Sequence, residues 1–201
     1  MAEAASLSVA DAAPRGERHA AVPSIFIFIA ADTASFVLFF AVFMAERLHQ
    51  VALFSRSARL LDARLGLLNT LILITSGWFV ALALAAIRSG RTKLARVRLM
   101  LALVVGSIFG IVKIIEYAGK IWHGLTPTTN EFFTFYYILT GVHFLHYLIG
   151  MALLLFLLGK VREPADEQTQ FLWFTPIAGY WHMVDLLWVF LFPMLYLQGG
   201  A

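Results

Sequence analysis

Long apolar stretches alternate with short charged segments along the whole chain. A helix that crosses the hydrocarbon core of a bilayer needs about 20 residues, because it rises about 1.5 Å per residue. Five stretches meet that length, at about residues 23–45, 65–87, 94–120, 132–159 and 171–197. Pro176 suits a first helical turn of the last stretch, whereas Pro193 is expected to kink or end it. The pattern predicts an all-α integral membrane protein, a bundle of five transmembrane helices.

The five stretches are expected to form one domain. No internal repeat and no low-complexity linker divides residues 23–201. Residues 1–22 are rich in Ala and carry Glu3, Asp11 and Glu17, and they lack the cationic start and apolar core of a secretory signal. We therefore expect residues 1–22 to be a disordered, uncleaved tail.

The composition agrees with a lipid environment. Hydrophobic residues make up 61% of the chain and charged residues 13%, with a mean hydropathy of +0.82. Zero Cys excludes disulfides, thiolate metal sites and thiol nucleophiles. A net charge of +3 could indicate a nucleic-acid partner, but most Lys and Arg lie in gaps between the apolar stretches. We interpret these cations as signals for membrane orientation and expect no nucleic-acid binding.

The distribution of cations predicts the orientation. Alternate gaps carry nine Lys and Arg on one side and five on the other, and the richer side is normally cytoplasmic. The nine are Arg15, Arg18, Arg88, Arg91, Lys93, Arg96, Arg98, Lys160 and Arg162, and the five are Arg47, Arg56, Arg59, Arg64 and Lys120. We expect a cytoplasmic N-terminus and an external C-terminus, in an inner (cell) membrane of the bacterial type.

Seven ionisable side chains are predicted at membrane depth, where each costs on the order of 3 kcal/mol to insert. They are Asp32, Lys113, Glu116, His143, His146, His182 and Asp185. Six of the seven form i,i+3 pairs, a spacing that places both members on one helical face. Three helices are therefore expected to present paired polar groups inward.

Lys113 and Glu116 lie in the third stretch, which spans a membrane only if both charges are accepted inside it. We favour a salt bridge near the end of the helix, with Lys113 reaching toward the headgroups, over a proton or lipid site. In the same stretch, Gly106 and Gly110 form a GxxxG pattern that allows close helix approach.

The two His of the fourth stretch could in principle ligate a metal or haem. Such a site needs further ligands of matching geometry, and the sequence offers neither Cys nor a local pattern of the His-Glu-x-x-His type. A neutral pair, His143 and His146, bonded to backbone carbonyls or a carboxylate of other helices needs no cofactor, and we prefer that interpretation. We expect neither a metal site nor catalytic residues in this chain.

Two acidic residues at membrane depth, Asp32 and Asp185, remain to be explained. Asp32 has no basic residue within one turn of its own helix, so it must find a partner elsewhere, meet water or stay protonated; functional and structural roles are both open. Trp181, Asp185 and Trp188 follow the i, i+4, i+7 spacing of one helical stripe, which must face protein or lipid headgroups.

Several motifs resemble one membrane family. The run YWHMVDLLW at 180–188, followed by FLFP at 190–193, resembles the closing helix of haem-copper oxidase subunit III. TGVHFLH at 140–146, Glu116-Tyr117 and LNT at 68–70 resemble further segments of that family in the same order. Asp32 stands where larger members usually have Glu. The likeness covers about residues 23–197, and five spans suit the short members.

Among short members, TPTTNEFF at 126–133 leading into FYYILTG at 135–141 looks most like the E-type accessory subunit beside nitric oxide reductases. This resemblance implies a role in denitrification. The alternative is subunit III of an aerobic cytochrome c or quinol oxidase. A small proton-coupled transporter is a second alternative, although the matching repeats with broken midplane helices are missing.

The resemblance implies a non-catalytic accessory subunit of the respiratory chain. Such a subunit binds no haem or copper, packs against the haem-copper catalytic subunit and its neighbours, holds phospholipid in a cleft between helices and supports sustained turnover. By analogy, Asp32 would lie near the lipid cleft. Glu116, His143 and His146 would line helix contacts. The closing-helix motif, Trp181, His182, Asp185 and Trp188, would brace the bundle.

Overall fold

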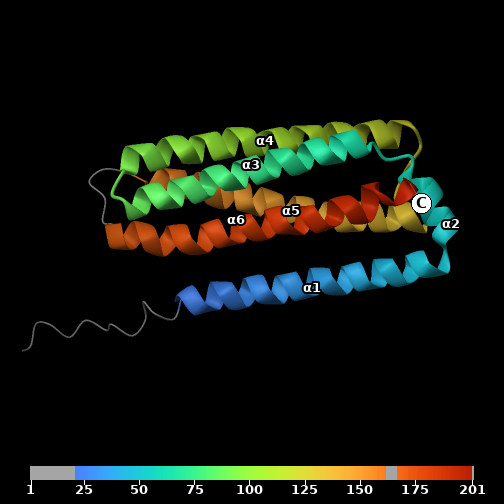
Figure 1. The fold of residues 1–201 in the computed structure, drawn as a ribbon, viewed down its shortest axis with the longest axis horizontal. Helices are drawn as coiled ribbons and strands as arrows, with labels where there is room; N and C mark the ends of the chain where they lie inside the picture. Colours follow the sequence, from blue (N-terminus) through green and yellow to red (C-terminus); the bar gives the residue numbers. More distant parts are fainter. Residues whose placement is uncertain (1–20, 162–166, 201) are drawn as a thin grey trace, which may run out of the picture.

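The computed structural model describes residues 21–161 and 167–200, and all of its regular structure is helical (Figure 1). Its elements are α1 (Ala21–His49), α2 (Val51–Ala58), α3 (Ala63–Arg88), α4 (Thr92–Trp122), α5 (Glu131–Lys160), α6 (Glu167–Tyr196) and the 3₁₀ turn η1 (Gln198–Gly200). Five helices, all except α2, are long and apolar enough to span a membrane. The predicted fold class, a bundle of five transmembrane helices, is confirmed.

The helix ends differ in detail from the predicted spans. α1 begins at Ala21 and so includes the last two residues of the predicted tail, whose residues 1–20 lie outside the described part of the chain. Pro193 does not end its helix, because α6 continues to Tyr196. A proline removes one backbone bond to the preceding turn, and a final turn tolerates that loss.

The long helices pack as an up-and-down bundle around α6. α3 and α4 make the most extensive contact, and α6 packs between α3 and α5. Figure 1 shows α1 running along the outer side of α6, on the opposite side from α3 and α4. The two ends of the described chain lie at opposite ends of the bundle. An odd number of crossings requires this arrangement.

A short amphipathic helix, α2, lies between the first two predicted spans. It buries Phe54 completely, and the Phe54 ring packs against Phe43 of α1 and against Phe132 and Phe135 of α5, with ring centroids 5.3 to 6.4 Å apart. An eight-residue helix is too short to produce a transmembrane signal. Its apolar side therefore closes one end of the bundle without having been predicted.

Capping side chains begin two of the long helices, and one of these caps also joins α5 to α2. Asp62 accepts backbone hydrogen bonds from Arg64 and Leu65 and so caps α3. Asn130 caps α5 by accepting from the Phe133 amide at 3.0 Å, and its amide nitrogen donates to Ser57 of α2 at 3.1 Å. These caps satisfy helix-end amides where the chain turns at the membrane face.

The GxxxG pattern of α4 does allow a close approach. A Cβ at Gly110 would lie 2.7 Å from the hydroxyl oxygen of Tyr147 on α5. That hydroxyl donates to the carbonyl of Gly106 at 3.0 Å. The two glycines thus accommodate a tyrosine of the neighbouring helix, and the packing role expected of them is confirmed.

Candidate functional site

A lysine lies inside the helix bundle with no exposed surface. Lys113 of α4 is 0% exposed, and its ammonium group donates three hydrogen bonds. The acceptors are Glu116 Oε2 at 3.0 Å, the Tyr136 hydroxyl at 3.1 Å and the Tyr196 hydroxyl at 2.9 Å. An ammonium group has three N–H donors, so each donor of Lys113 is satisfied.

Glu116 closes this network from the other side. Its Oε1 accepts hydrogen bonds from the Tyr136 hydroxyl at 3.0 Å and the Tyr196 hydroxyl at 2.8 Å, so each tyrosine accepts from the lysine and donates to the carboxylate. A second cation, Lys120, lies 3.7 Å from the same oxygen. A buried ion pair is tolerated when its remaining donors and acceptors are bonded, as they are here.

Aromatic rings surround the buried ammonium group. The Nζ of Lys113 lies 4.9 to 5.5 Å from the ring centroids of Tyr117, Tyr136, Trp188 and Tyr196, within the range of cation–π attraction. The expectation that Lys113 reaches toward the headgroups is therefore wrong. The rings and hydroxyls inside the bundle replace the water that the headgroup region would have supplied.

Helix topology explains how this network forms. The C-terminal part of α4, the N-terminal part of α5 and the C-terminal end of α6 meet at the same end of the bundle (Figure 1). α3 joins them, because the Trp188 indole donates to Thr70 at 3.1 Å. No pattern in the sequence indicates Tyr136 and Tyr196 as partners of Lys113. The order of the spans places Tyr136 and Tyr196 at the same membrane face as Lys113. It does not show which helices lie next to one another.

A surface pocket leads toward this network. It has a volume of about 620 Å³, and it lies between the start of α3 and the end of α4. Its polar lining residues are Asp62, Glu116, Lys120 and His123. Glu116 therefore lies at the inner wall of a hollow that opens at one end of the bundle. The rest of the carboxylate lies inside the bundle.

Asp32 and His146 form a second buried polar contact, between α1 and α5. The carboxylate oxygen Oδ1 of Asp32 lies 3.0 Å from Nε2 of His146, and both side chains are mostly buried. The Phe36 ring packs edge-on against the imidazole at 5.4 Å. Among the options left open for Asp32, the structure selects a partner on another helix.

The hydrogen bonds of His146 define what this pair can do. Its Nδ1 lies 2.8 Å from the Val142 carbonyl, which can only accept, so Nδ1 carries a hydrogen. A neutral ring then has a lone pair at Nε2, facing Asp32. A hydrogen bond between Nε2 and Oδ1 therefore needs one shared proton, and this contact links α1 to the bundle.

His143 points away from His146 and toward α6. It is fully buried, and its Nε2 lies 3.1 Å from the Val184 carbonyl. The Phe109 and Trp188 rings pack against it. Each His thus bonds to a different neighbouring helix, as expected for an interhelical pair. Within residues 21–161 and 167–200, no group of three His, Cys, Asp or Glu side chains is placed to hold a metal ion.

The closing-helix motif divides between the core and the surface. Trp181, Asp185 and Trp188 are all buried, so the stripe faces protein. The His182 side chain is 45% exposed, and the expectation that it points inward beside Asp185 is wrong. Residues i and i+3 lie roughly 60° apart around a helix. This angle places His182 at the edge of the contact with α3, while Asp185 lies within the contact.

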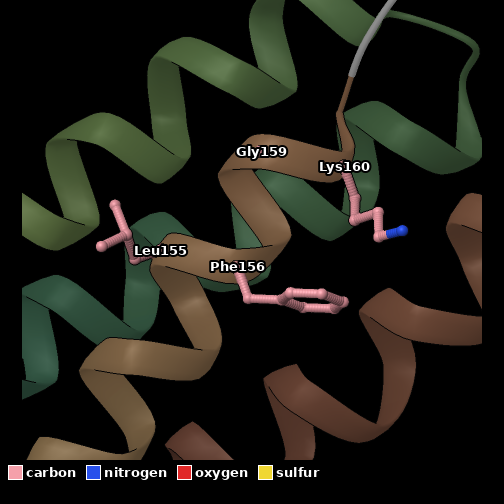
Figure 2. A pocket seen from close by; sticks show the side chains of 4 residues that line it. All are labelled: Leu155, Phe156, Gly159 and Lys160. Atoms are coloured by element: carbon pink, nitrogen blue, oxygen red, sulfur yellow. The ribbon is translucent and has the colours of Figure 1, made fainter.

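A further hollow of about 540 Å³ lies at the C-terminal end of α5, lined by Leu155, Phe156, Gly159 and Lys160. Figure 2 shows Phe156 and Lys160 pointing to the same side of the helix, with Leu155 pointing the other way. The Lys160 ammonium lies 5.4 Å from the Phe156 ring centroid. A lysine over an aromatic ring at a helix end is typical of anchoring at the membrane surface.

The comparisons with known proteins identify the family. Residues 19–200 match the sequence profile of "Cytochrome c oxidase subunit III". The chain belongs to the cytochrome c oxidase subunit III family. The five apolar helices make it a multi-pass membrane protein of that family, as the closing-helix and fourth-stretch motifs implied.

Relatives within the subunit III family differ in length. Cytochrome c oxidase subunit 3 of Prototheca wickerhamii is 34% identical over 134 residues, and that of Schizophyllum commune is 35% identical over 138. These matches cover 67% and 68% of this chain but 50% of each relative, so the chain spans about half their length. The probable quinol oxidase subunit 3 of Staphylococcus aureus (strain USA300) is 26% identical over 173 residues, 86% of both chains.

Proposed function

We propose that this chain is the non-redox third subunit of a membrane haem-copper oxidase complex. The observation that carries the proposal is the family match across almost the entire chain, residues 19–200. The side chains that could have supplied chemistry also support it, since Lys113, Glu116 and His143 all form hydrogen bonds to neighbouring helices. In this role the chain packs beside the catalytic subunit and stabilises it during turnover.

The partner proposed first is an oxygen-reducing enzyme. The relatives described above are named as subunits of cytochrome c and quinol oxidases, and the quinol oxidase relative matches this chain in length. The E-type resemblance rests on residues 126–141 alone. The nitric oxide reductase complex is therefore the second candidate, favoured by that segment.

The proposal extends to location and lipid. We propose an inner (cell) membrane of the bacterial type, with the N-terminus cytoplasmic and the C-terminus external, as the cation count predicts. We also propose bound phospholipid and no haem, copper or other metal held by this chain. We propose that a lipid cleft of the family type opens between α1 and the bundle, near the Asp32–His146 contact.

The experiment is purification of the tagged chain from its native membrane in a gentle detergent, followed by optical spectroscopy, metal analysis and mass spectrometry. Recovery of a haem-bearing catalytic subunit supports the proposal, and its activity with oxygen or nitric oxide distinguishes the two candidates. A tagged, unrelated multi-pass protein from the same membrane is the control for nonspecific recovery. Isolation of a stable, colourless chain without partners would refute the proposal and favour a transporter.

A further inference from the structure

One exposed face of the bundle carries a polar group, His182, in the middle of a membrane span. We call it the α3–α6 face, formed by Ile74 and Trp78 of α3 and by His182, Leu186 and Val189 of α6. Its apolar members are 37% to 60% exposed, and the His182 side chain is 45% exposed. His182 lies near the middle of the α6 span, Trp173–Tyr196. An imidazole at that depth has no hydrogen-bond partner in lipid chains.

The carboxylate behind this face has no hydrogen-bond partner within the described residues. Asp185 is 7% exposed, and its two carboxylate oxygens are buried and accept no hydrogen bond from the described residues. His182 Nδ1 lies 3.7 Å from Oδ2, which is too long for a hydrogen bond. Gly77 of α3 lies directly beneath the carboxylate, because a Cβ there would overlap Oδ2. This close packing holds the Asp185 carboxylate in place beside the exposed imidazole.

Other exposed faces differ from this one at similar depth. The outer side of α4 presents Val104, Ile108 and Ile111, and that of α1 presents Val37 and Leu38. The hydroxyls on these two sides are already bonded, since Ser107 donates to the Val104 carbonyl and Ser35 to the Ala31 carbonyl. These two sides therefore suit lipid chains, whereas the α3–α6 face requires a polar partner.

We propose that the α3–α6 face docks a transmembrane helix of the haem-copper catalytic subunit, and that this helix presents a hydrogen-bond donor to the exposed imidazole of His182. The inference rests on the proposed function and adds the docking face and the chemistry of the contact. The occupant must be helical, because at this depth only a helix satisfies its own backbone. Its donor is a hydroxyl, amide or cationic side chain, complementary to a lone pair of the His182 imidazole, and the surrounding apolar side chains exclude water.

Site-specific photo-cross-linking tests the assignment in the intact complex. A benzophenone amino acid replaces Leu186 in the full tagged chain, and a matched chain carries it at Leu145, which is similarly exposed (52% and 56%) near the middle of α5. Leu145 points away from α6, being about 200° around α5 from His143, whose ring faces α6. Irradiation of membranes should link position 186 to the haem-bearing subunit and position 145 to phospholipid.

A second measurement uses His182→Phe, which keeps a ring of similar size and removes both nitrogens, with Leu145→Phe as the control. Loss of one interhelical hydrogen bond in a membrane lowers association up to about tenfold. We expect recovery of the haem-bearing subunit per chain to fall toward that limit for His182→Phe and to stay unchanged for Leu145→Phe. Both isolated variants should unfold at the wild-type temperature, because both positions are exposed.

The outcomes separate the two proposals. A link from position 186 to lipid or to a second copy of this chain, while the haem-bearing subunit still co-purifies, would overturn the docking face and leave the proposed function standing. A link from position 145 to the haem-bearing subunit, with position 186 linked to lipid, would likewise overturn the docking face and leave the proposed function standing. Absence of any haem-bearing protein from the wild-type preparation would refute the proposed function and the docking face together.

Discussion

The Tyr196 hydroxyl, in the last turn of α6, lies 2.9 Å from the buried ammonium of Lys113 on α4 and 2.8 Å from the carboxylate of Glu116. This one hydroxyl accepts from the cation and donates to the anion, as the Tyr136 hydroxyl of α5 does. Three helices are thus joined through a charge pair that lipid could not stabilise. We therefore predict separately how the charges and the hydroxyls of this network contribute to stability.

Lys113→Met should destabilise the isolated chain strongly, because it leaves the Glu116 carboxylate buried beside a more distant Lys120. Breaking a buried pair from one side costs about 3 to 5 kcal/mol in free energy of unfolding. Reversible unfolding in mixed detergent micelles measures the loss. The double variant Lys113→Met/Glu116→Gln should recover much of it, since no uncompensated charge remains. Equal losses in the single and double variants would show that the cost is one of packing and not of charge.

Tyr196→Phe should lower the free energy of unfolding by about 1.5 to 3 kcal/mol, the range for a hydrogen bond to a charged group. The ring remains, so packing against Phe192 and Trp188 is retained. Tyr137→Phe is the matched control, because the Tyr137 hydroxyl donates only to the backbone carbonyl of Leu125, outside the charge pair. Its loss should be about 1 kcal/mol. Identical losses would argue that the charges add nothing to the strength of the Tyr196 contacts.

Asp32→Asn should leave folding and assembly intact while it changes the activity of the complex or the decay of that activity during turnover. An asparagine amide can donate to the lone pair on His146 Nε2, so the contact between α1 and α5 persists without a shared proton. Activity is followed over successive turnovers of the purified complex. Asp32→Leu is the control that removes the contact altogether. Failure of Asp32→Asn to assemble would make Asp32 a purely structural partner.

Gly77→Ala should destabilise the contact between α3 and α6, because the added Cβ overlaps the Asp185 carboxylate and lies 3.3 Å from His182 Nδ1. We expect a loss of about 1 to 3 kcal/mol, as for other overpacked sites. Gly141→Ala on α5 is the control, since nothing lies within 4 Å of a Cβ there. It should be neutral or stabilise by up to about 1 kcal/mol, the usual helix gain. Thermal unfolding of both variants measures these changes in stability. An unchanged unfolding temperature for Gly77→Ala would show that α3 and α6 shift freely to make room for the added Cβ.

The features that could be predicted from sequence depend on properties of single segments. Length and hydropathy identified the five spans, because each crossing must satisfy its own backbone within one continuous helix. The GxxxG pattern and the buried stripe of Trp181 and Trp188 were also local, and they followed from the helical period. The amphipathic helix α2 could not be predicted in this way. Its eight residues are too few to stand out from a charged loop.

The sequence by itself determined that the chain is a bundle of five membrane-spanning helices and that seven ionisable groups lie within them. Only the tertiary structure decided their partners. It paired Asp32 with His146, placed Tyr136 and Tyr196 around Lys113, and turned His182 outward beside a buried Asp185. A helical period indicates which residues share one face, but it cannot indicate which neighbouring helix that face meets. That choice depends on the shapes of all five helices packed together.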